Sequence, residues 1–245
     1  MEKKRTIAIT SGKGGVGKTS IVSNIAYFLS YNSKSIYILD ADFSLGNVDV
    51  MFGIIPRFNI KDYLDGTKRI QDIMVKGPNG IRIIPATTGV SEFSNLSEEE
   101  RDKIFLSFKE MDGYDYLIVD TAAGISSNVV YFNHISDESF IIITPEPASL
   151  TDSYATIKVL RNKTGRKEFH VIMNMVRDER EAITVFKKLL SVTDRFLDVY
   201  INFFGYIPLD KNVPIAIKRQ KPLIEVFPET HATKALIKIG NKLLA

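Results

Sequence analysis

Cysteine is missing from this sequence altogether. Without it the chain cannot form disulfide bonds, thiolate nucleophiles, cysteine-held iron–sulfur clusters or zinc sites of the cysteine type. Long apolar runs are also missing, because no stretch reaches the roughly 18 apolar residues that a membrane-spanning helix needs. The apolar stretch behind the basic residues 1–5 is too short for a secretory signal. These absences predict a cytoplasmic protein.

The sequence also has little net charge, since 32 Lys and Arg against 29 Asp and Glu give +3 at pH 7. A charge this small does not indicate a general nucleic-acid-binding protein. The basic excess is concentrated in residues 208–245, which carry seven basic and three acidic side chains. A chain of 245 residues, 44% of them hydrophobic, can bury a substantial core. In the absence of repeats and linkers we expect one domain over residues 1–245.

Short apolar runs alternate along the chain with longer segments of helical periodicity. The runs are rich in Ile, Val, Tyr and Phe at nearly every position, which is typical of strands buried on both faces of a parallel sheet. The runs are residues 6–10, 35–40, 81–85, 116–120, 140–144, 169–174 and 203–208, and the helical segments are 19–30, 97–111, 149–161, 179–196 and 230–244. This alternation predicts an α/β fold, a doubly wound and mostly parallel sheet with helices on both faces.

Polar side chains follow several of these runs where the strands end. They are Asp40, Asp120, Thr144, Asn174 and Asp210. Helix capping or turn formation accounts for any one of them alone. In an open α/β sheet, however, ligands bind beyond the carboxyl ends of the strands. The five positions together therefore predict a site at that edge of the sheet.

A glycine-rich segment follows the first predicted strand, and it matches the phosphate-binding pattern G-x-x-x-x-G-K-[ST]. It reads Gly12-Lys13-Gly14-Gly15-Val16-Gly17-Lys18-Thr19. Its glycines let successive N–H groups turn towards phosphate oxygens, and the start of the next helix adds the positive end of its dipole. Lys18 would bridge the β- and γ-phosphates, and the Thr19 hydroxyl would ligate Mg²⁺. We therefore predict a nucleotide site over residues 12–20, with Ser20 as its last member.

A second lysine, Lys13, directly follows the first glycine, where ordinary phosphate loops need none. The segment K-G-G-V-G-K-T resembles the deviant Walker A motif of the MinD/ParA family of ATPases. The resemblance covers about residues 6–244 and implies a MinD-like P-loop NTPase fold, with ATP or ADP and Mg²⁺ as ligands. In that family the first lysine reaches phosphates bound by the other subunit. Carried over, Lys13 couples ATP binding to homodimer formation and supplies positive charge in trans, much as an arginine finger does.

The same resemblance implies roles for other polar residues. Asp42 would orient the attacking water, with Asp40 nearer the Mg²⁺, and Asp120 would hold Mg²⁺ through water as a Walker B acid. Asn174 and the loop 208–210 would contact adenine. The implied catalytic residues are Lys13, Lys18 and Asp42, the implied metal ligands are Thr19, Asp40 and Asp120, and the implied base contacts are Asn174, Pro208 and Asp210. Glu146 would lie near the ribose, across the dimer. The implied activity is a slow, Mg²⁺-dependent ATPase coupled to the dimer.

Several longer stretches resemble the flagellar-number regulators of this family, the FlhG group. They are residues 40–49, 80–90, 115–126, 144–154 and 206–223. The likeness implies an ATP-dependent dimer, peripheral on the inner face of the cell membrane, that works with an SRP-like GTPase and flagellar basal-body proteins. FlhG proteins often carry an extension before the P-loop strand, which here begins near Met1. Stimulation of a GTPase would then need another surface.

Two other functions stay open at this stage. A MinD-type division-site regulator would share the chemistry and differ in its partner. A ParA-type DNA-partition ATPase would use the basic cluster of Lys211, Lys218, Arg219 and Lys221. The low overall charge, together with the lack of a helix-turn-helix pattern before the P-loop, argues against nucleic acid as a partner.

The predicted last helix, residues 230–244, has two different stripes. One is apolar, and the other carries Lys234, Lys238 and Lys242 at i, i+4 and i+8. A basic amphipathic helix of this kind can lie on anionic membrane. Alternatively it is the final core helix with its lysines in water, and Leu243 and Leu244 at its end would then be only partly covered.

Overall fold

The computed structural model describes residues 4–43, 46–87 and 96–245. Its strands are β1 (Arg5–Ser11), β2 (Ile36–Ala41), β3 (Val75–Lys76), β4 (Arg82–Ile84), β5 (Tyr116–Ala123), β6 (Glu138–Ile143), β7 (Glu168–Val176) and β8 (Tyr200–Pro208). They form an eight-stranded sheet in the order β3-β4-β2-β5-β1-β6-β7-β8. Neighbouring strands are parallel except for β3 with β4, which are antiparallel. The predicted doubly wound, mostly parallel sheet is therefore confirmed.

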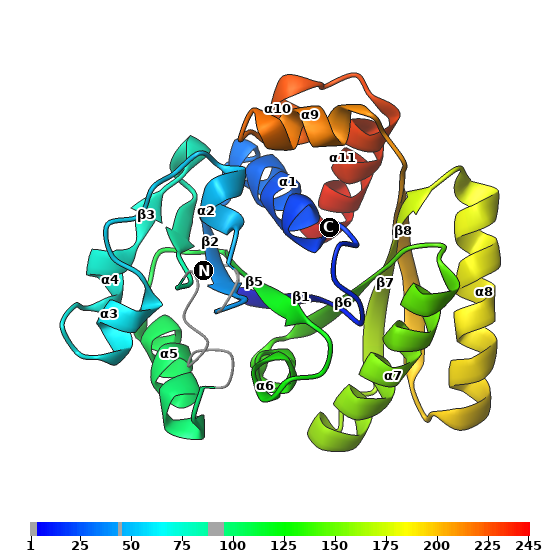
Figure 1. The fold of residues 1–245 in the computed structure, drawn as a ribbon, viewed down its shortest axis with the longest axis horizontal. Helices are drawn as coiled ribbons and strands as arrows, with labels where there is room; N and C mark the ends of the chain where they lie inside the picture. The colour runs from blue at the N-terminus through cyan, green and yellow to red at the C-terminus, as the bar shows by residue number, and fades with distance from the viewer. Residues whose placement is uncertain (1–3, 44–45, 88–95) are drawn as a thin grey trace.

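Helices cover both faces of this sheet (Figure 1). They are α1 (Lys18–Tyr31), α2 (Val48–Met51), α3 (Ile60–Leu64), α4 (Ile70–Ile73), α5 (Glu98–Glu110), α6 (Ser127–Ile135), α7 (Pro147–Thr164), α8 (Glu179–Phe196), α9 (Asn212–Lys218), α10 (Leu223–Val226) and α11 (His231–Leu244), with a short 3₁₀ turn at Pro78–Gly80. The five predicted helices correspond to α1, α5, α7, α8 and α11. Sequence analysis missed β3, α6 and the one- and two-turn helices.

Alternate residues of the central strands face opposite layers of the core. In β2, Ile38 packs in the cluster that includes α1 and α11, whereas Leu39 packs in the cluster that includes α5 and α6. Both side chains are almost fully buried. A strand buried on both faces must be apolar at successive positions, which explains why the runs in the sequence show no alternation.

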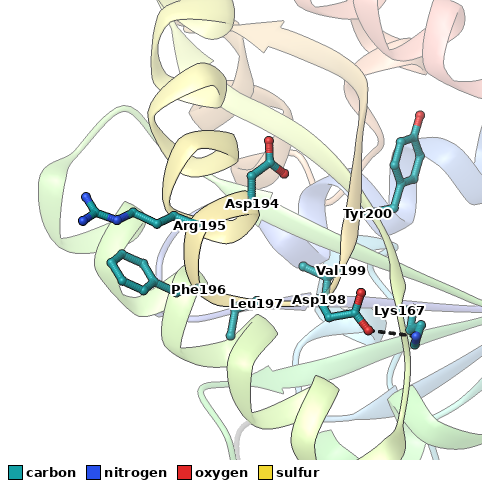
Figure 2. A pocket seen from close by; sticks show the side chains of 8 residues that line it. All are labelled: Lys167, Asp194, Arg195, Phe196, Leu197, Asp198, Val199 and Tyr200. Carbon is teal, nitrogen blue, oxygen red and sulfur yellow. Dashed lines mark ion pairs between the residues drawn. The ribbon is translucent and has the colours of Figure 1, made fainter.

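The connection from α8 to β8 is held by ion pairs at the amino ends of the strands. Figure 2 shows Asp198 beside Lys167, with 2.8 Å between Oδ2 and Nζ, and Asp198 also pairs with Arg161 at 3.2 Å. Phe196 and Tyr200 flank this turn and are 61% and 65% exposed. The ion pairs tie the start of β8 to the α7–β7 connection.

Helix α11 is a core helix, because its apolar stripe is buried against α1 and β8. Leu244 is partly covered, as expected, but the same expectation for Leu243 was wrong, since Leu243 is only 1% exposed. The Tyr116 hydroxyl donates to the Leu243 carbonyl at 2.7 Å, and Arg5 donates to the same oxygen. These bonds hold the last turn of α11 on the sheet. No helix within the described ranges is both long and apolar enough to cross a membrane.

The crossing of α11 and α1 depends on Gly240, because a Cβ there would overlap the ring of Phe28. Alanine inside a helix normally stabilises by about 1 kcal/mol relative to glycine. Here we expect Gly240→Ala to lower the free energy of unfolding by about 1–3 kcal/mol, since overpacking outweighs that gain. Urea denaturation measures the change, and Asn241→Ala, on the exposed side of α11, is the control. A Gly240→Ala variant as stable as the parent would contradict this packing.

Candidate functional site

A cavity of about 450 Å³ lies at the carboxyl ends of β1, β7 and β8. The glycine-rich loop and the start of α1 form one wall, while the ends of β7 and β8, with α9, form the opposite wall. The predicted residues that line it are Lys13, Gly14, Gly15, Val16, Gly17, Lys18, Thr19, Ser20, Asp42, Asn174, Pro208 and Asp210. Gly12, Asp40 and Asp120 are not among the lining residues and lie behind the wall. Positions far apart in the sequence thus meet at one cavity.

The loop is folded closely around Asn174 at the end of β7. Asn174 Nδ2 donates to the Val16 carbonyl at 2.7 Å. Gly17 has a φ of +86° and precedes the first turn of α1, and a Cβ on it would lie 2.5 Å from Asn174 Nδ2. Glycine is needed at this position both for the left-handed backbone and for the close approach. The amide predicted to contact adenine therefore also holds the loop.

Gly12 brings the loop directly against α7, because a Cβ at Gly12 would overlap the backbone of Asp152. At the start of the same helix, Glu146 Oε2 lies 2.6 Å from Lys13 Nζ. The hydrogen bond from Lys13 to this carboxylate, followed by its charge, raises the pKa of the Lys13 ammonium. The family resemblance places both Lys13 and Glu146 at a dimer interface. In this structure they form an ion pair with each other within one chain.

Two carboxylates are buried beneath the loop. Asp40 of β2 and Asp120 of β5 are paired in the register of the sheet, and each is 1% exposed. Lys18 Nζ lies 3.3 Å from Asp120 Oδ1, and the Thr19 hydroxyl donates to the same carboxylate. Asp40 accepts the backbone N–H of Val48 at 3.0 Å and that of Asp42 at 3.2 Å.

Burial raises the pKa of Asp40 well above its ordinary value, and the neighbouring charge of Asp120 adds to the shift. Burial also raises the pKa of Asp120, although the Lys18 ammonium opposes the shift. Two buried carboxyl groups with a single ammonium beside them are an electrostatically costly arrangement. Arrangements of this kind cluster at functional sites because a cation or substrate relieves them.

The oxygen donors gathered beneath the glycine-rich loop fit Mg²⁺, which prefers oxygen ligands. Thr19 contributes a hydroxyl, and Asp40 and Asp120 contribute carboxylates. Across the described part of the chain, no group of three or more His, Cys, Asp or Glu side chains could hold a metal ion. A magnesium ion here would therefore complete its shell with water and with oxygens of a bound phosphate, as Mg²⁺ usually does.

Asp210 has a structural role in the loop after β8. Its carboxylate accepts the backbone N–H of Asn212 at 2.8 Å and the side-chain amide of Asn212 at 2.9 Å, and it also bonds Thr230. Burial acts to raise the pKa of Asp210, but these hydrogen bonds together outweigh it and leave the pKa lowered. The loop from Pro208 to Asp210 is therefore tied to the starts of α9 and α11 while it borders the cavity.

Sequence analysis missed several residues of the site. Apolar side chains also line the cavity, Met51, Val213, Ile217 and Leu223 from short helices and Leu236 from α11. Met175 also lines it, with a φ of +58° that no residue pattern signals. Gly46 was read only as part of a family stretch, yet a Cβ there would lie 2.6 Å from Asp40 Oδ2. Residues 44–45 and 88–90 of those stretches lie outside the described residues.

Comparison with known proteins accounts for this geometry. The chain matches the ParA family, described as NUBPL iron-transfer P-loop NTPase, over residues 2–244. The chain belongs to the ParA/MinD family of P-loop NTPases. This membership confirms the family and the fold predicted from the sequence, and NTP binding and hydrolysis are the reaction class of the family.

Individual relatives extend this result. The chain is 38% identical to antiactivator FleN of Pseudomonas aeruginosa, covering 99% of this chain and 87% of FleN. It is 32% identical to the flagellum site-determining protein YlxH of Helicobacter pylori, covering 98% of this chain and 81% of YlxH. In the MinC:MinD cell division complex of Aquifex aeolicus, the matching chain is 27% identical, with a TM-score of 0.79 and coverage of 98% of this chain and 95% of that one.

The buried acid pair predicts a specific pH dependence of stability without nucleotide and Mg²⁺. The pKa of Asp40 is raised in the folded state, so at low pH this carboxyl group is neutral in both states and does not oppose folding. As the pH rises above the ordinary value of 3.8, the group ionises more readily in the unfolded chain, and it then destabilises the folded state. When the pH is raised from about 4.5 to about 7.5, we expect the free energy of unfolding of Asp40→Ala to increase relative to that of the wild type. Urea denaturation at both pH values measures it. A pH-independent difference would be the contrary result.

Proposed function

We propose that this chain is an ATP-binding and ATP-hydrolysing dimeric switch that regulates flagellar number or placement, like the FlhG (FleN) group. The main support is the contrast between the two lysines of the glycine-rich loop. The Lys18 side chain is 10% exposed and points into its own site, whereas the Lys13 side chain is 41% exposed at the surface. Lys18 is thus suited to phosphates bound by its own chain, and Lys13 to those of a second copy.

The cavity suits a nucleotide in one orientation. The triphosphate would lie in the loop of residues 12–20, where backbone N–H groups and the start of α1 favour anions. The base would lie between Asn174 and the loop 208–210, against the apolar side chains of α9 and α10. An amide beside the base both donates and accepts, which suits the edge of adenine. ATP and ADP are accordingly the proposed ligands.

Hydrolysis requires a positioned water and compensation of the charge that develops on the phosphoryl oxygens. Asp42 lines the cavity near the proposed γ-phosphate position and would orient the water. Lys18 would exchange part of its contact with Asp120 for the β- and γ-phosphates. Mg²⁺, held by Thr19, Asp40 and Asp120, would supply positive charge to the phosphate oxygens.

Lys13 has to leave Glu146 before it can reach a second subunit. The pair is exposed to solvent, so breaking it opposes dimer formation only weakly. Charge in trans would then arrive only when two ATP-bound copies meet. A monomer lacks this charge and would therefore hydrolyse ATP slowly. Slow hydrolysis before dimer formation suits a protein that switches between two states. We propose that residues 1–245 act as one domain in this cycle.

The likeness to FleN and YlxH over nearly the whole chain favours a flagellar function over a MinD-type division-site function. A second copy of the chain is the first proposed partner. An SRP-type GTPase of the FlhF kind and flagellar basal-body proteins are the others, at the inner face of the cell membrane. Because the apolar stripe of α11 is buried, reversible binding to anionic lipid would use another part of the protein.

DNA partition is disfavoured by the state of the basic cluster near α9. Lys221 pairs with Glu225, and Arg219 packs over the ring of Phe227. These contacts leave fewer cations available for phosphates of nucleic acid.

The role of Lys13 is tested by Lys13→Ala. This variant should bind ATP with an affinity within about threefold of wild type, since Lys18 is intact, but it should stay monomeric. Calorimetry with a non-hydrolysable ATP analogue and sedimentation velocity measure the two properties. Lys18→Ala is the comparison and should lose nucleotide binding. A Lys13→Ala protein that dimerises with ATP would refute the role in trans.

The role of Asp42 is tested by Asp42→Ala. This variant should still form the ATP-dependent dimer, but its phosphate release should fall by about 10²–10⁴-fold, since a positioned water is lost. Steady-state phosphate release and oligomeric state are measured on the same samples. Asp65→Ala, on an exposed helix end away from the cavity, should keep the wild-type rate. Wild-type turnover in Asp42→Ala would remove its assignment.

A further inference from the structure

Strand β8 forms an open edge of the sheet. It is the last strand in the order and, within the described ranges, pairs only with β7. In a parallel strand, alternate N–H and C=O groups point to each side, so one row of β8 points outward. Lys242 Nζ donates to the Phe204 carbonyl at 2.6 Å. Phe204 is the residue at which the register between β7 and β8 shifts, so this lysine satisfies a carbonyl at an irregular point of the strand.

A groove of about 950 Å³ runs along this edge between α11 and the start of α8. Lys234, Lys238 and Lys242 line it from α11, whose opposite face is buried in the core. Aromatic side chains of β8, including Phe203 and Tyr206, also line it. The groove therefore combines a backbone edge, an aromatic strand and a row of cations.

The charge in the groove is predominantly positive. Five basic side chains line it, Arg177, Lys211, Lys234, Lys238 and Lys242, against the acidic side chains Asp178, Glu179 and Asp210. Asp178 caps α8 and Asp210 holds the loop before α9, while two of the basic side chains are paired at the surface, Arg177 with Glu181 and Lys234 with Glu229. Among the described residues, Lys211 and Lys238 form no ion pair. An acidic ligand would compensate this charge.

We propose that the groove beside β8 binds an acidic, extended segment of a partner protein, which adds to the sheet as a further strand. A polypeptide is favoured over lipid or nucleic acid because only a peptide backbone can pair with the alternating N–H and C=O groups of a strand edge. Side chains on one face of a strand repeat every 6–7 Å or so, close to the rise of about 6 Å between helix positions i and i+4. Acidic residues at alternate positions of the segment would thus face successive lysines of α11. Pro208, which lacks an N–H, marks the end of the pairing.

The proposal is tested with two synthetic ten-residue peptides, one alternating Glu and Val and the other alternating Lys and Val. The acidic peptide should bind the wild-type chain in fluorescence anisotropy, and hydrogen exchange should slow at amides of β8. The basic peptide should not bind. Lys238→Glu should weaken binding of the acidic peptide by at least about tenfold, since an attraction becomes a repulsion. Lys188→Glu, on an exposed position of α8 outside the groove, is the matched control and should bind as wild type does.

Several results would overturn the proposal. They are absence of binding to the wild type, equal binding of both peptides, no effect of Lys238→Glu, or binding without protection of β8. Phosphatidylglycerol vesicles and duplex DNA serve as further probes. If Lys238→Glu weakens binding to one of these while the acidic peptide fails to bind, the lysine row belongs to a membrane or nucleic-acid surface instead. ATP hydrolysis should be unchanged in Lys238→Glu, so the outcome is independent of the proposed ATPase cycle.

Discussion

The close approach of the glycine-rich loop to its neighbours is the constraint on which the site depends. Gly12 lies against the backbone of α7, and Gly17 lies against the amide of Asn174 on β7. A side chain at either position would push the loop away from the elements that shape it. With both contacts in place, the loop is connected to α7 on one side and to β7 on the other. The position of the loop backbone thus depends on the absence of side chains at Gly12 and Gly17, together with the hydrogen bond from Asn174 to the Val16 carbonyl.

Charge is distributed around this loop on two levels. Beneath it, Asp40, Asp120 and Lys18 form a buried group with an excess of negative charge. Above it, Lys13 and Glu146 form an exposed pair with no excess. The buried group is poorly compensated and would gain most from a cation, whereas the exposed pair can exchange partners at little cost. In the proposed cycle, the buried group would bind the ligand and the exposed pair would contact the second copy of the chain.

The sequence was sufficient to predict the sheet, the longer helices and many of the residues that line the cavity. Strands buried on both faces appear in the sequence as unbroken apolar runs. The P-loop motif identifies its residues directly, because each position of the pattern corresponds to one residue of the loop. Contacts over long sequence separations could not be predicted in the same way. The Lys13–Glu146 pair joins residues 133 positions apart, and the link from Tyr116 to the Leu243 carbonyl, which buries Leu243, joins residues 127 apart. Strand β3 has two residues, too few for any periodic pattern.

The loop from Pro208 to Asp210 borders the cavity proposed for the nucleotide on one side and the groove beside β8 on the other. A single short segment is therefore a shared wall between two binding volumes. Thermodynamic reciprocity then applies: if filling one volume displaces this wall and changes affinity in the other by some factor, the reverse effect has the same factor. The hydrogen bonds that fasten Asp210 to α9 and α11 determine how stiff the wall is. These hydrogen bonds therefore determine whether binding in one volume changes the affinity of the other.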